Sequence, residues 1–326
     1  MVISTTDDSI PGVRVEPLFA KGAGVRNLLR VPKMRRLVRK FDPDLVHGHY
    51  LTVGGFYAAL SGGKRIVGSA WGSDIYVGPV KSRKERVILK YVLRKCDFVF
   101  ACTQDMAERI RSYGYDGEIA IFRWGVDPAV FRRISSHGTG EFRILSIRPC
   151  DPIYNQSVIL EAFKKALPSL GNSYLYLLDF GSSVEEVHRV VDADSELKQR
   201  VRWLPRIPYE EMPERYGSGD ISVSLSTSDG VPASVLESMV CETPVIATDN
   251  TAMRIWVEDG ITGYLTRIDP GVLSEKMLRS FSERTRLSEM GRRSRDKILD
   301  PKNQGTFESN LKVAEESYDR IVKTVA

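Results

Sequence analysis

Two acidic residues, one in a loop and one on the helix expected after it, are the residues of this chain best placed to do chemistry. Asp229 precedes Gly230 and Pro232, and Glu237 lies within an apolar helical pattern that begins at Ala233. A glycine followed by a proline near a helix start is typical of a helix N-terminus. Acids two turns apart lie on roughly one helix face, so both carboxylates are expected to face one site.

The same helix start predicts an anion site. The first turn of a helix leaves backbone N–H groups without partners, and the helix macrodipole favours negative charge there. An anion such as a diphosphate is therefore expected at this point of the chain. After the helix, Pro244 opens the apolar run PVIA, which predicts a buried parallel strand.

Strand-like runs alternate with helical stretches along the whole chain. Before residue 125 these runs are VRVEPLF, DLVHGH, RIVGSA, DFVFAC and EIAIF. After it they are FRILSI, YLYLLDF, VRWLP, DISVSL, PVIA and GYL. The alternation predicts parallel sheets built from βαβ units. Between the two series, the polar segment Arg132 to Glu141 is the expected linker.

The segment from Asp229 to Glu237 resembles the E-x7-E region of family 4 retaining glycosyltransferases, with Asp in place of the first Glu. Further motifs follow the order of that family between Asp42 and about Gly263, namely DPDLVHGHY, WGSDI, RWGVDPAVF, SIRPCDPIYN, GSGDISVSLSTSDG and VEDGITGYL. The resemblance covers roughly two-thirds of the chain. It implies an α/β fold of GT-B type, with two Rossmann-like domains whose parallel sheets face each other across a cleft.

The linker and the resemblance together predict three parts. Residues 1–131 would form an N-terminal Rossmann-like, acceptor-side domain, and residues 132–306 a C-terminal Rossmann-like domain that binds the nucleotide sugar. Residues 307–326 would form a helix that crosses back to the first domain. Members of the family usually begin with a strand and a Gly-rich loop, whereas MVISTT resembles their second strand. The first domain is therefore expected to be truncated at its start, and the alternative is an opening that has diverged beyond recognition.

The resemblance also implies roles for single residues. Arg148, which follows FRILSI, matches the phosphate-binding arginine of the family and would stabilise the leaving diphosphate. The family usually adds a lysine several residues later, where this chain has Asn155. Asparagine carries no charge, so stabilisation of the leaving diphosphate should be weaker unless Arg206 or Arg254 supplies the missing positive charge. Glu237 would bind the ribose hydroxyls of the nucleotide.

The donor sugar would be held by the loop before the helix, which comprises Asp229, Gly230, Val231, Pro232 and Ala233. In this scheme the catalytic residues are Arg148 and Asp229.

Trp71 stands where the family has the histidine of a His-Gly-x-Asp motif. Its indole N–H would replace the hydrogen bond of that histidine to the donor sugar, and the alternative is a core tryptophan.

Composition agrees with a soluble two-domain enzyme, because 326 residues exceed one typical domain and 42% of them are hydrophobic. No apolar run reaches membrane-spanning length, and the start lacks the organisation of a signal peptide. The four cysteines are scattered, which predicts reduced packing residues in a cytoplasmic protein. Neither a DxD motif in a suitable loop nor a metal-ligand spacing occurs. We expect no metal, and no cofactor besides the nucleoside diphosphate sugar that serves as donor substrate.

Positive charge is concentrated in the first third of the chain. Between Lys21 and Lys95 there are 17 lysines and arginines but only four aspartates and glutamates, a net charge of +13 against +5 for the whole chain. Within it, VRNLLRVPKMRRLVRKF predicts a basic amphipathic helix. Such a helix suits an anionic membrane surface, and the alternative is a core-facing helix with a solvated basic face. Nucleic-acid binding is not expected, since no recognised motif accompanies the charge.

These observations favour a retaining glycosyltransferase that moves a sugar from a nucleoside diphosphate sugar to a glycan or lipid-linked acceptor in cell-envelope or polysaccharide biosynthesis. It would be cytoplasmic, with peripheral association to the inner face of the membrane. The alternative hypothesis is a degenerate or fragmentary homologue that binds nucleotide without turnover. Asn155, Trp71 and the missing opening favour that alternative, and Arg148 and Glu237 oppose it.

Overall fold

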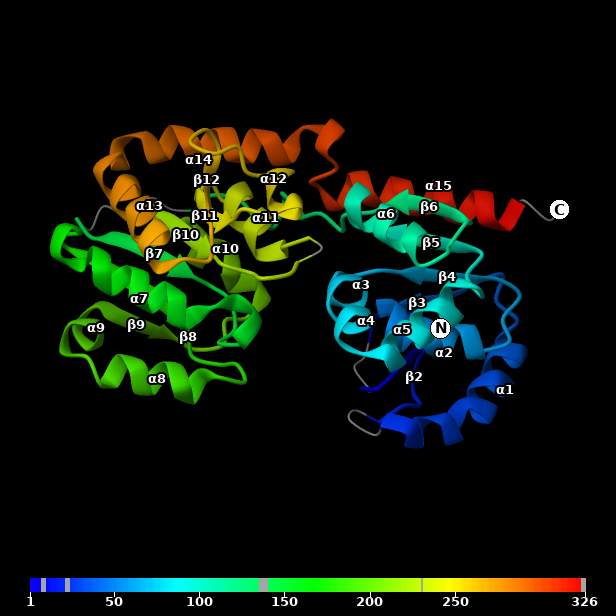
Figure 1. Cartoon of the computed structure of the whole chain (residues 1–326). Helices are drawn as coiled ribbons and strands as arrows, with labels where there is room; N and C mark the ends of the chain where they lie inside the picture. The colour runs from blue at the N-terminus through cyan, green and yellow to red at the C-terminus, as the bar shows by residue number, and fades with distance from the viewer. Residues whose placement is uncertain (7–9, 21–23, 135–139, 230, 324–326) are drawn as a thin grey trace. The chain divides into compact units, whose positions relative to one another are not determined.

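The chain forms two compact units in a computed structural model that describes residues 1–6, 10–20, 24–134, 140–229 and 231–323. The first unit comprises Met1–Phe122 and Val313–Ala326, and the second comprises Arg123–Lys312. Helix α15 (Phe307–Lys323, red in Figure 1) begins in the second unit and becomes part of the first from Val313 onward. Each unit is described by itself below.

The first unit is built on parallel strands. Its four-stranded sheet has the order β3-β4-β5-β6 and comprises β3 (Val46–His49), β4 (Ile66–Ser69), β5 (Phe98–Ala101) and β6 (Glu118–Ile121). Strands β4 and β5 are buried along their whole length, which explains their continuous apolar sequences. A separate two-stranded parallel sheet pairs β1 (Val2–Ser4) with β2 (Val15–Pro17).

Helices and helical turns connect the strands of the first unit. They are η1 (Gly24–Arg30), α1 (Val31–Phe41), η2 (Tyr50–Gly55), α2 (Phe56–Leu60), α3 (Ser73–Tyr76), α4 (Gly78–Lys81), α5 (Arg83–Leu93) and α6 (Gln104–Ser112). The predicted basic helix is a 3₁₀ turn followed by an α-helix, because Pro32 lies in the first turn of α1. Met34 and Val38 of α1 are buried, whereas its arginines and lysines are exposed.

The second unit contains a six-stranded parallel sheet with the order β12-β11-β10-β7-β8-β9. Its strands are β7 (Phe142–Ser146), β8 (Ser173–Leu178), β9 (Val201–Leu204), β10 (Ile221–Ser224), β11 (Val245–Thr248) and β12 (Gly263–Thr266). The chain runs outward from β7 to β9 on one side, then returns to β10 beside β7 and runs outward to β12. The strand order therefore reverses between β7 and β10.

Helices cover this sheet. Their buried apolar residues pack with those of the strands in two hydrophobic core clusters. The α-helices are α7 (Gln156–Ala166), α8 (Val184–Asp192), α9 (Ser195–Arg200), α10 (Met212–Gly217), α11 (Ala233–Val240), α12 (Thr251–Arg254), α13 (Pro270–Ser282) and α14 (Arg284–Leu299). Short 3₁₀ turns are η3 (Pro152–Tyr154), η4 (Leu167–Ser169), η5 (Tyr209–Glu211) and η6 (Pro301–Asn303).

The boundary between the units lies at Phe122 and Arg123, not at the predicted residue 131. Phe131 is fully buried in a core cluster of the second unit, together with Val126. The backbone N–H of Arg123 donates to the side chain of Asn310, which fixes the chain at the start of this unit. The expected linker from Arg132 onward therefore belongs to the second unit, and its residues 135–139 lie outside the described residues.

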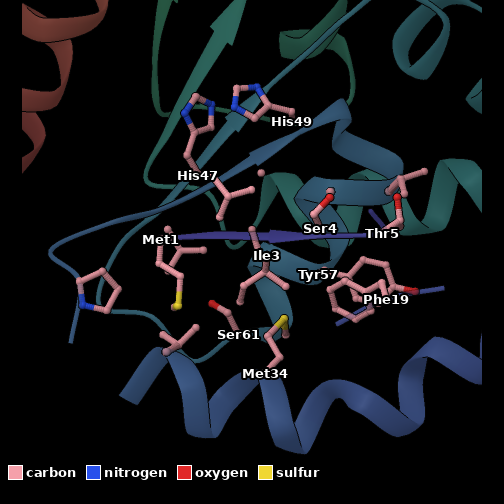
Figure 2. A pocket seen from close by; sticks show the side chains of 18 of the residues that line it. Met1, Ile3, Ser4, Thr5, Phe19, Met34, His47, His49, Tyr57 and Ser61 are labelled. Carbon is pink, nitrogen blue, oxygen red and sulfur yellow. The ribbon is translucent and has the colours of Figure 1, made fainter. Parts of the chain in front are cut away.

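A cavity of about 840 Å³ lies within the first unit (Figure 2). All residues of β1 and β3 line it, together with part of α1. No lysine, arginine, aspartate or glutamate is among the described residues that line it. His47 of β3 lies at one side, with Nδ1 2.7 Å from Tyr318 Oη and Nε2 2.7 Å from Ser69 Oγ. Burial, helped by nearby His49, lowers the pKa of His47 to about 3, so the ring is neutral at pH 7.

The four cysteines are buried free thiols, as expected for packing residues. Over the described ranges, no helix combines the length and the apolar character that crossing a lipid bilayer requires.

Candidate functional site

The carboxyl ends of β7 and β10 carry the candidate site. In an open parallel sheet, the loops at the point where strand order reverses diverge and leave a crevice, where ligands bind. Arg148 lies two residues beyond the end of β7, and Ser226 to Asp229 follow β10. The fold thus brings together residues that are about 80 positions apart in the sequence, as Arg148 and Asp229 are.

Arg148 is held from three sides and is only 8% exposed. Its Nη2 donates to Asp229 Oδ2 at 2.7 Å, and its Nη1 donates to Ser234 Oγ at 2.7 Å. The guanidinium carbon lies 3.9 Å from the ring centroid of Tyr154, a stacked cation–π contact. The Nε atom is buried and has no hydrogen-bond partner among the described residues. Arg148 is therefore pre-oriented, and its charge is neutralised by Asp229.

Helix α11 begins directly beside this arginine. Pro232 precedes it and accepts from the N–H groups of Val235 and Leu236 through its carbonyl oxygen. No side chain caps the helix, and within the described ranges the backbone N–H groups of Ala233 and Ser234 have no acceptor. Two N–H donors and the positive end of the helix dipole thus lie beside a guanidinium, which is the chemistry that binds phosphate groups.

Glu237 lies one turn further along α11. Its Oε2 accepts a hydrogen bond of 3.1 Å from the hydroxyl of Tyr216, a fully buried residue of α10. Burial raises the pKa of the Glu237 carboxyl, while the bond from Tyr216 and the charge of Arg148 lower it in part. Among the described residues, none donates a hydrogen bond to Oε1. This carboxylate can accept further hydrogen bonds from hydroxyl groups.

The side chain of Asn155 joins two loops of the site. Its backbone is left-handed, with φ of 53°, at the start of α7. Its Nδ2 lies 2.7 Å from the carbonyl of Leu225 and 2.9 Å from Thr227 Oγ1, which are two acceptors for its two N–H groups. These bonds join the loop after β7 to the loop after β10, so both amide donors of Asn155 have protein partners in this structure.

The other residues predicted for the donor site are not held together as Arg148 and Asp229 are. Arg206 is exposed in the loop after β9, and Arg254 is paired with Asp249 through two hydrogen bonds of 2.5 and 3.0 Å. Val231 is half-buried against the core of the second unit. Gly230 lies outside the described residues. Arg254 therefore has a carboxylate partner of its own.

Trp71 belongs to the first unit and is 45% exposed, so it is not a core residue. It follows β4, and its ring lies 6.2 Å from that of His49, edge to face. Beside it, Asp74 is fully buried and accepts from the backbone N–H groups of Leu51, Trp71 and Gly72 at 2.8 to 3.0 Å. Asp74 thus holds the loops after β3 and β4 together.

Sequence reasoning missed four residues that shape these sites: Tyr154, Tyr216, Ser234 and Asp74. Tyr154, Ser234 and Asp74 stand inside the motifs that drew attention to the region, but only a structure shows which side chains they contact. Tyr216 lies just before one of those motifs and carries no sequence signal of its own.

Two protein-family models together match nearly the whole chain. Residues 4–130 match Glycosyltransferase Family 4, and residues 129–297 match Glycosyl transferases group 1. The second match alone spans more than half of the chain and contains every residue of the Arg148 site.

One curated relative is a D-inositol 3-phosphate glycosyltransferase from Streptosporangium roseum, which is 28% identical over 193 residues. The alignment covers 53% of this chain and 44% of the relative, so the chain spans less than half the length of that protein.

Two solved structures share the fold over most of the chain. Sucrose-phosphate synthase from Thermosynechococcus elongatus has a TM-score of 0.80 at 16% identity, covering 96% of this chain and 84% of its own. HepE from Anabaena, solved in complex with UDP and glucose, has a TM-score of 0.75 at 17% identity, covering 94% and 86%. The predicted α/β fold of GT-B type, with two Rossmann-like domains, is confirmed.

Proposed function

The chain belongs to the glycosyl transferases group 1 family, and we propose that it transfers a sugar from a nucleoside diphosphate sugar to an acceptor. The observation that carries this proposal is the grouping of the Arg148 guanidinium with the N–H groups of Ala233 and Ser234, which find no acceptor in the described part of the chain. A diphosphate carries the complementary charge, and its oxygens can accept from all of these donors.

In this proposal the second unit binds the donor. The diphosphate lies at the N-terminus of α11 and on Arg148, and the ribose hydroxyls donate to Glu237. Asp229, now paired with Arg148 at 2.7 Å, gives up that partner to the diphosphate and turns to the donor sugar. The donor sugar is also contacted by the loop that contains Val231 and Pro232.

Transfer requires negative charge to grow on the leaving diphosphate. Donors that are already oriented stabilise that charge without reorganisation, and they act more strongly in a site that excludes water. Arg148 meets this requirement because Ser234 and Tyr154 fix its plane. Charge from an arginine and a helix N-terminus replaces the metal ion that other transferases use, so we propose a metal-independent reaction with the nucleotide sugar as sole donor.

We further propose retention of the anomeric configuration and a glycan or lipid-linked acceptor. HepE, which shares the fold, was solved with UDP and glucose, which makes UDP-sugars the first donors to test. Incubation with a panel of UDP-, GDP- and ADP-sugars should release the nucleoside diphosphate from one of them. NMR of the released or transferred sugar then reports its anomer, and an inverted product would overturn the retaining assignment.

A second candidate function is nucleotide binding without turnover. Two observations favour it: an uncharged residue, Asn155, stands where the family pattern has a lysine, and Asp229 neutralises Arg148. Both functions predict saturable binding of a nucleoside diphosphate. Release of the nucleoside diphosphate from the sugar nucleotide distinguishes them, because only a transferase catalyses it.

We also propose that the basic segment of the first unit places the protein on the cytoplasmic face of a membrane. Leu29 of η1 is 84% exposed, and the basic residues of α1 are exposed beside it. An exposed leucine next to exposed arginines and lysines suits a surface of anionic lipid.

A further inference from the structure

Tyr216 is joined to helix α11 by hydrogen bonds of its backbone as well as by its hydroxyl. It is fully buried in α10, and its backbone carbonyl accepts a hydrogen bond of 2.6 Å from Thr243 Oγ1. The carbonyl of Thr243 in turn accepts from Ser238 Oγ at 2.9 Å. Because Ser238 follows Glu237 on α11, this chain of bonds fixes the tyrosine relative to the helix that carries the carboxylate.

The hydroxyl of Tyr216 reaches only one oxygen of Glu237. It donates to Oε2 at 3.1 Å, and in the described part of the chain no group donates to Oε1. Glu237 is half-buried, and its Oε1 is not among the buried atoms that lack a partner, so this oxygen is open to solvent or to a ligand. One oxygen held by the protein and one left for a ligand is the arrangement expected when a carboxylate must face a diol in one orientation.

Three other titratable or charged groups lie around Glu237. Arg148 follows β7, Tyr209 lies in η5, and Cys241 directly follows the last residue of α11. Of these, Arg148 favours the ionised carboxylate. Tyr216 favours it too, through its hydrogen bond, whereas burial opposes it. Ionisation matters because only the carboxylate form accepts from two hydroxyl groups without donating.

We propose that Tyr216 is a positioning residue for nucleotide binding, which orients the Glu237 carboxylate toward the ribose hydroxyls. This inference rests on the proposed function, because it requires Glu237 to meet the ribose. The competing explanation is that Tyr216 is a core residue whose hydroxyl is merely satisfied by the nearest acceptor. Its ring does pack in the core, 6.3 Å from that of Phe131. The two explanations differ in what the hydroxyl does for the ligand.

The test is Tyr216→Phe, which removes the hydroxyl and keeps the ring. The probe is the nucleoside diphosphate that the wild type binds most tightly among UDP, GDP, ADP and CDP, together with its 2′,3′-dideoxy analogue. Calorimetric titration at pH 8 should show affinity for the natural nucleotide reduced about tenfold. Affinity for the dideoxy analogue should be unchanged, because the hydroxyls that need an oriented Glu237 are absent from it.

The pH dependence adds a second readout. Loss of the hydrogen bond removes an interaction that favours ionised Glu237, so the carboxyl of the variant stays protonated to higher pH. The deficit in affinity should therefore be larger at pH 6 than at pH 8. Tyr264→Phe is the matched control, since Tyr264 is equally buried and donates at 3.1 Å to Glu283 in the same unit. Its nucleotide affinity should equal that of the wild type at both pH values.

The outcomes separate cleanly. Wild-type affinity in Tyr216→Phe, or an equal loss for the natural and dideoxy nucleotides, would overturn the positioning role. If the variant does not fold, Thr243→Val serves instead, because it removes the hydrogen bond that holds the Tyr216 carbonyl. It should weaken binding of the natural nucleotide more than binding of the dideoxy analogue, and equal losses would overturn the positioning role. If the wild type binds none of the four nucleotides, the proposed function fails first, and that result is distinguishable from failure of the inference alone.

Discussion

At the residue scale, Arg148 is the side chain on which turnover should depend most. It is buried, oriented by Ser234 and Tyr154, and paired with Asp229. Since charge on the diphosphate grows toward the transition state, Arg148→Ala should lower kcat by about 100-fold or more while KM changes little. Steady-state kinetics with the active donor would measure both. A variant with raised KM and wild-type kcat would contradict the leaving-group role.

The hydrogen bonds of Asn155 indicate that a lysine at this position would be harmful. A lysine there restores the charge of the family pattern, but it loses the bonds to Leu225 and Thr227 and must adopt a left-handed backbone. Asparagine tolerates that conformation better than lysine. Asn155→Lys should therefore destabilise the protein by about 1–3 kcal/mol, from two lost hydrogen bonds and a less favourable backbone conformation, and lower activity.

Denaturant unfolding and donor turnover, measured on the same preparation of Asn155→Lys, would check this expectation. Asn155→Asp is a useful companion, because it keeps the left-handed preference but removes both amide donors. Raised turnover in the lysine variant, with unchanged stability, would mean that the missing charge is a real deficit of the site.

The sequence indicated several residues of the site but not how they pair. Arg148, Asp229 and Glu237 were identified from their place at strand and helix ends, and the structure groups them around the start of α11. The pairing of Arg148 with Asp229 could not be foreseen, since it depends on loop conformations that bring residues from two strands within 2.7 Å. Tyr216 escaped notice because a buried hydroxyl leaves no pattern in the sequence.

At the element scale, regular strands were easy to predict and boundaries were not. Every predicted run overlaps a strand of the structure. The reason is clearest for β4, β5, β10 and β11, which are buried along their whole length, since strands buried on both faces are continuously apolar. The linker was misplaced because composition alone favoured the polar segment after Arg132, whereas buried Phe131 ties the preceding residues to the second unit. The basic helix begins later than predicted, because Pro32 starts a new helix after a 3₁₀ turn.

The basic helix α1 carries the membrane prediction. Arg36, Arg39 and Lys40 are exposed, and no hydrogen bond or ion pair of theirs is found within the described ranges. If they face anionic lipid, each contributes about 1 kcal/mol near the surface, and added salt weakens binding. Replacing all three by Glu should abolish co-sedimentation with vesicles that contain phosphatidylglycerol, while nucleotide binding stays unchanged.

The matched control makes the same charge change elsewhere. Arg284, Arg292 and Lys302 are exposed in the second unit, and their replacement by Glu should leave vesicle binding as it is in the wild type. Equal partitioning of the wild type to neutral and anionic vesicles, or to neither, would mean that the basic face of α1 is only solvated. A soluble glycan would then be the better acceptor to test.

At the scale of the whole molecule, charge and function divide between the two units. The excess of positive charge lies between Lys21 and Lys95, in the first unit, whereas the Arg148 site lies in the second. The match to glycosyl transferases group 1 covers the second unit from residue 129 to 297. Donor binding should therefore be a property of the second unit's residues, and surface binding a property of the first.

The central claim is that the Arg148 site binds a nucleoside diphosphate through the N-terminus of α11 and Glu237, and calorimetric titration tests it most directly. Wild-type protein should bind one equivalent of UDP, GDP, ADP or CDP. Glu237→Ala should weaken that binding by about 1–3 kcal/mol, the range for leaving hydrogen-bonding partners unpaired. Glu283→Ala, which removes the acceptor of Tyr264 in the same unit, should bind like the wild type. Absence of binding to all four nucleotides, or undiminished affinity in folded Glu237→Ala, would contradict the account.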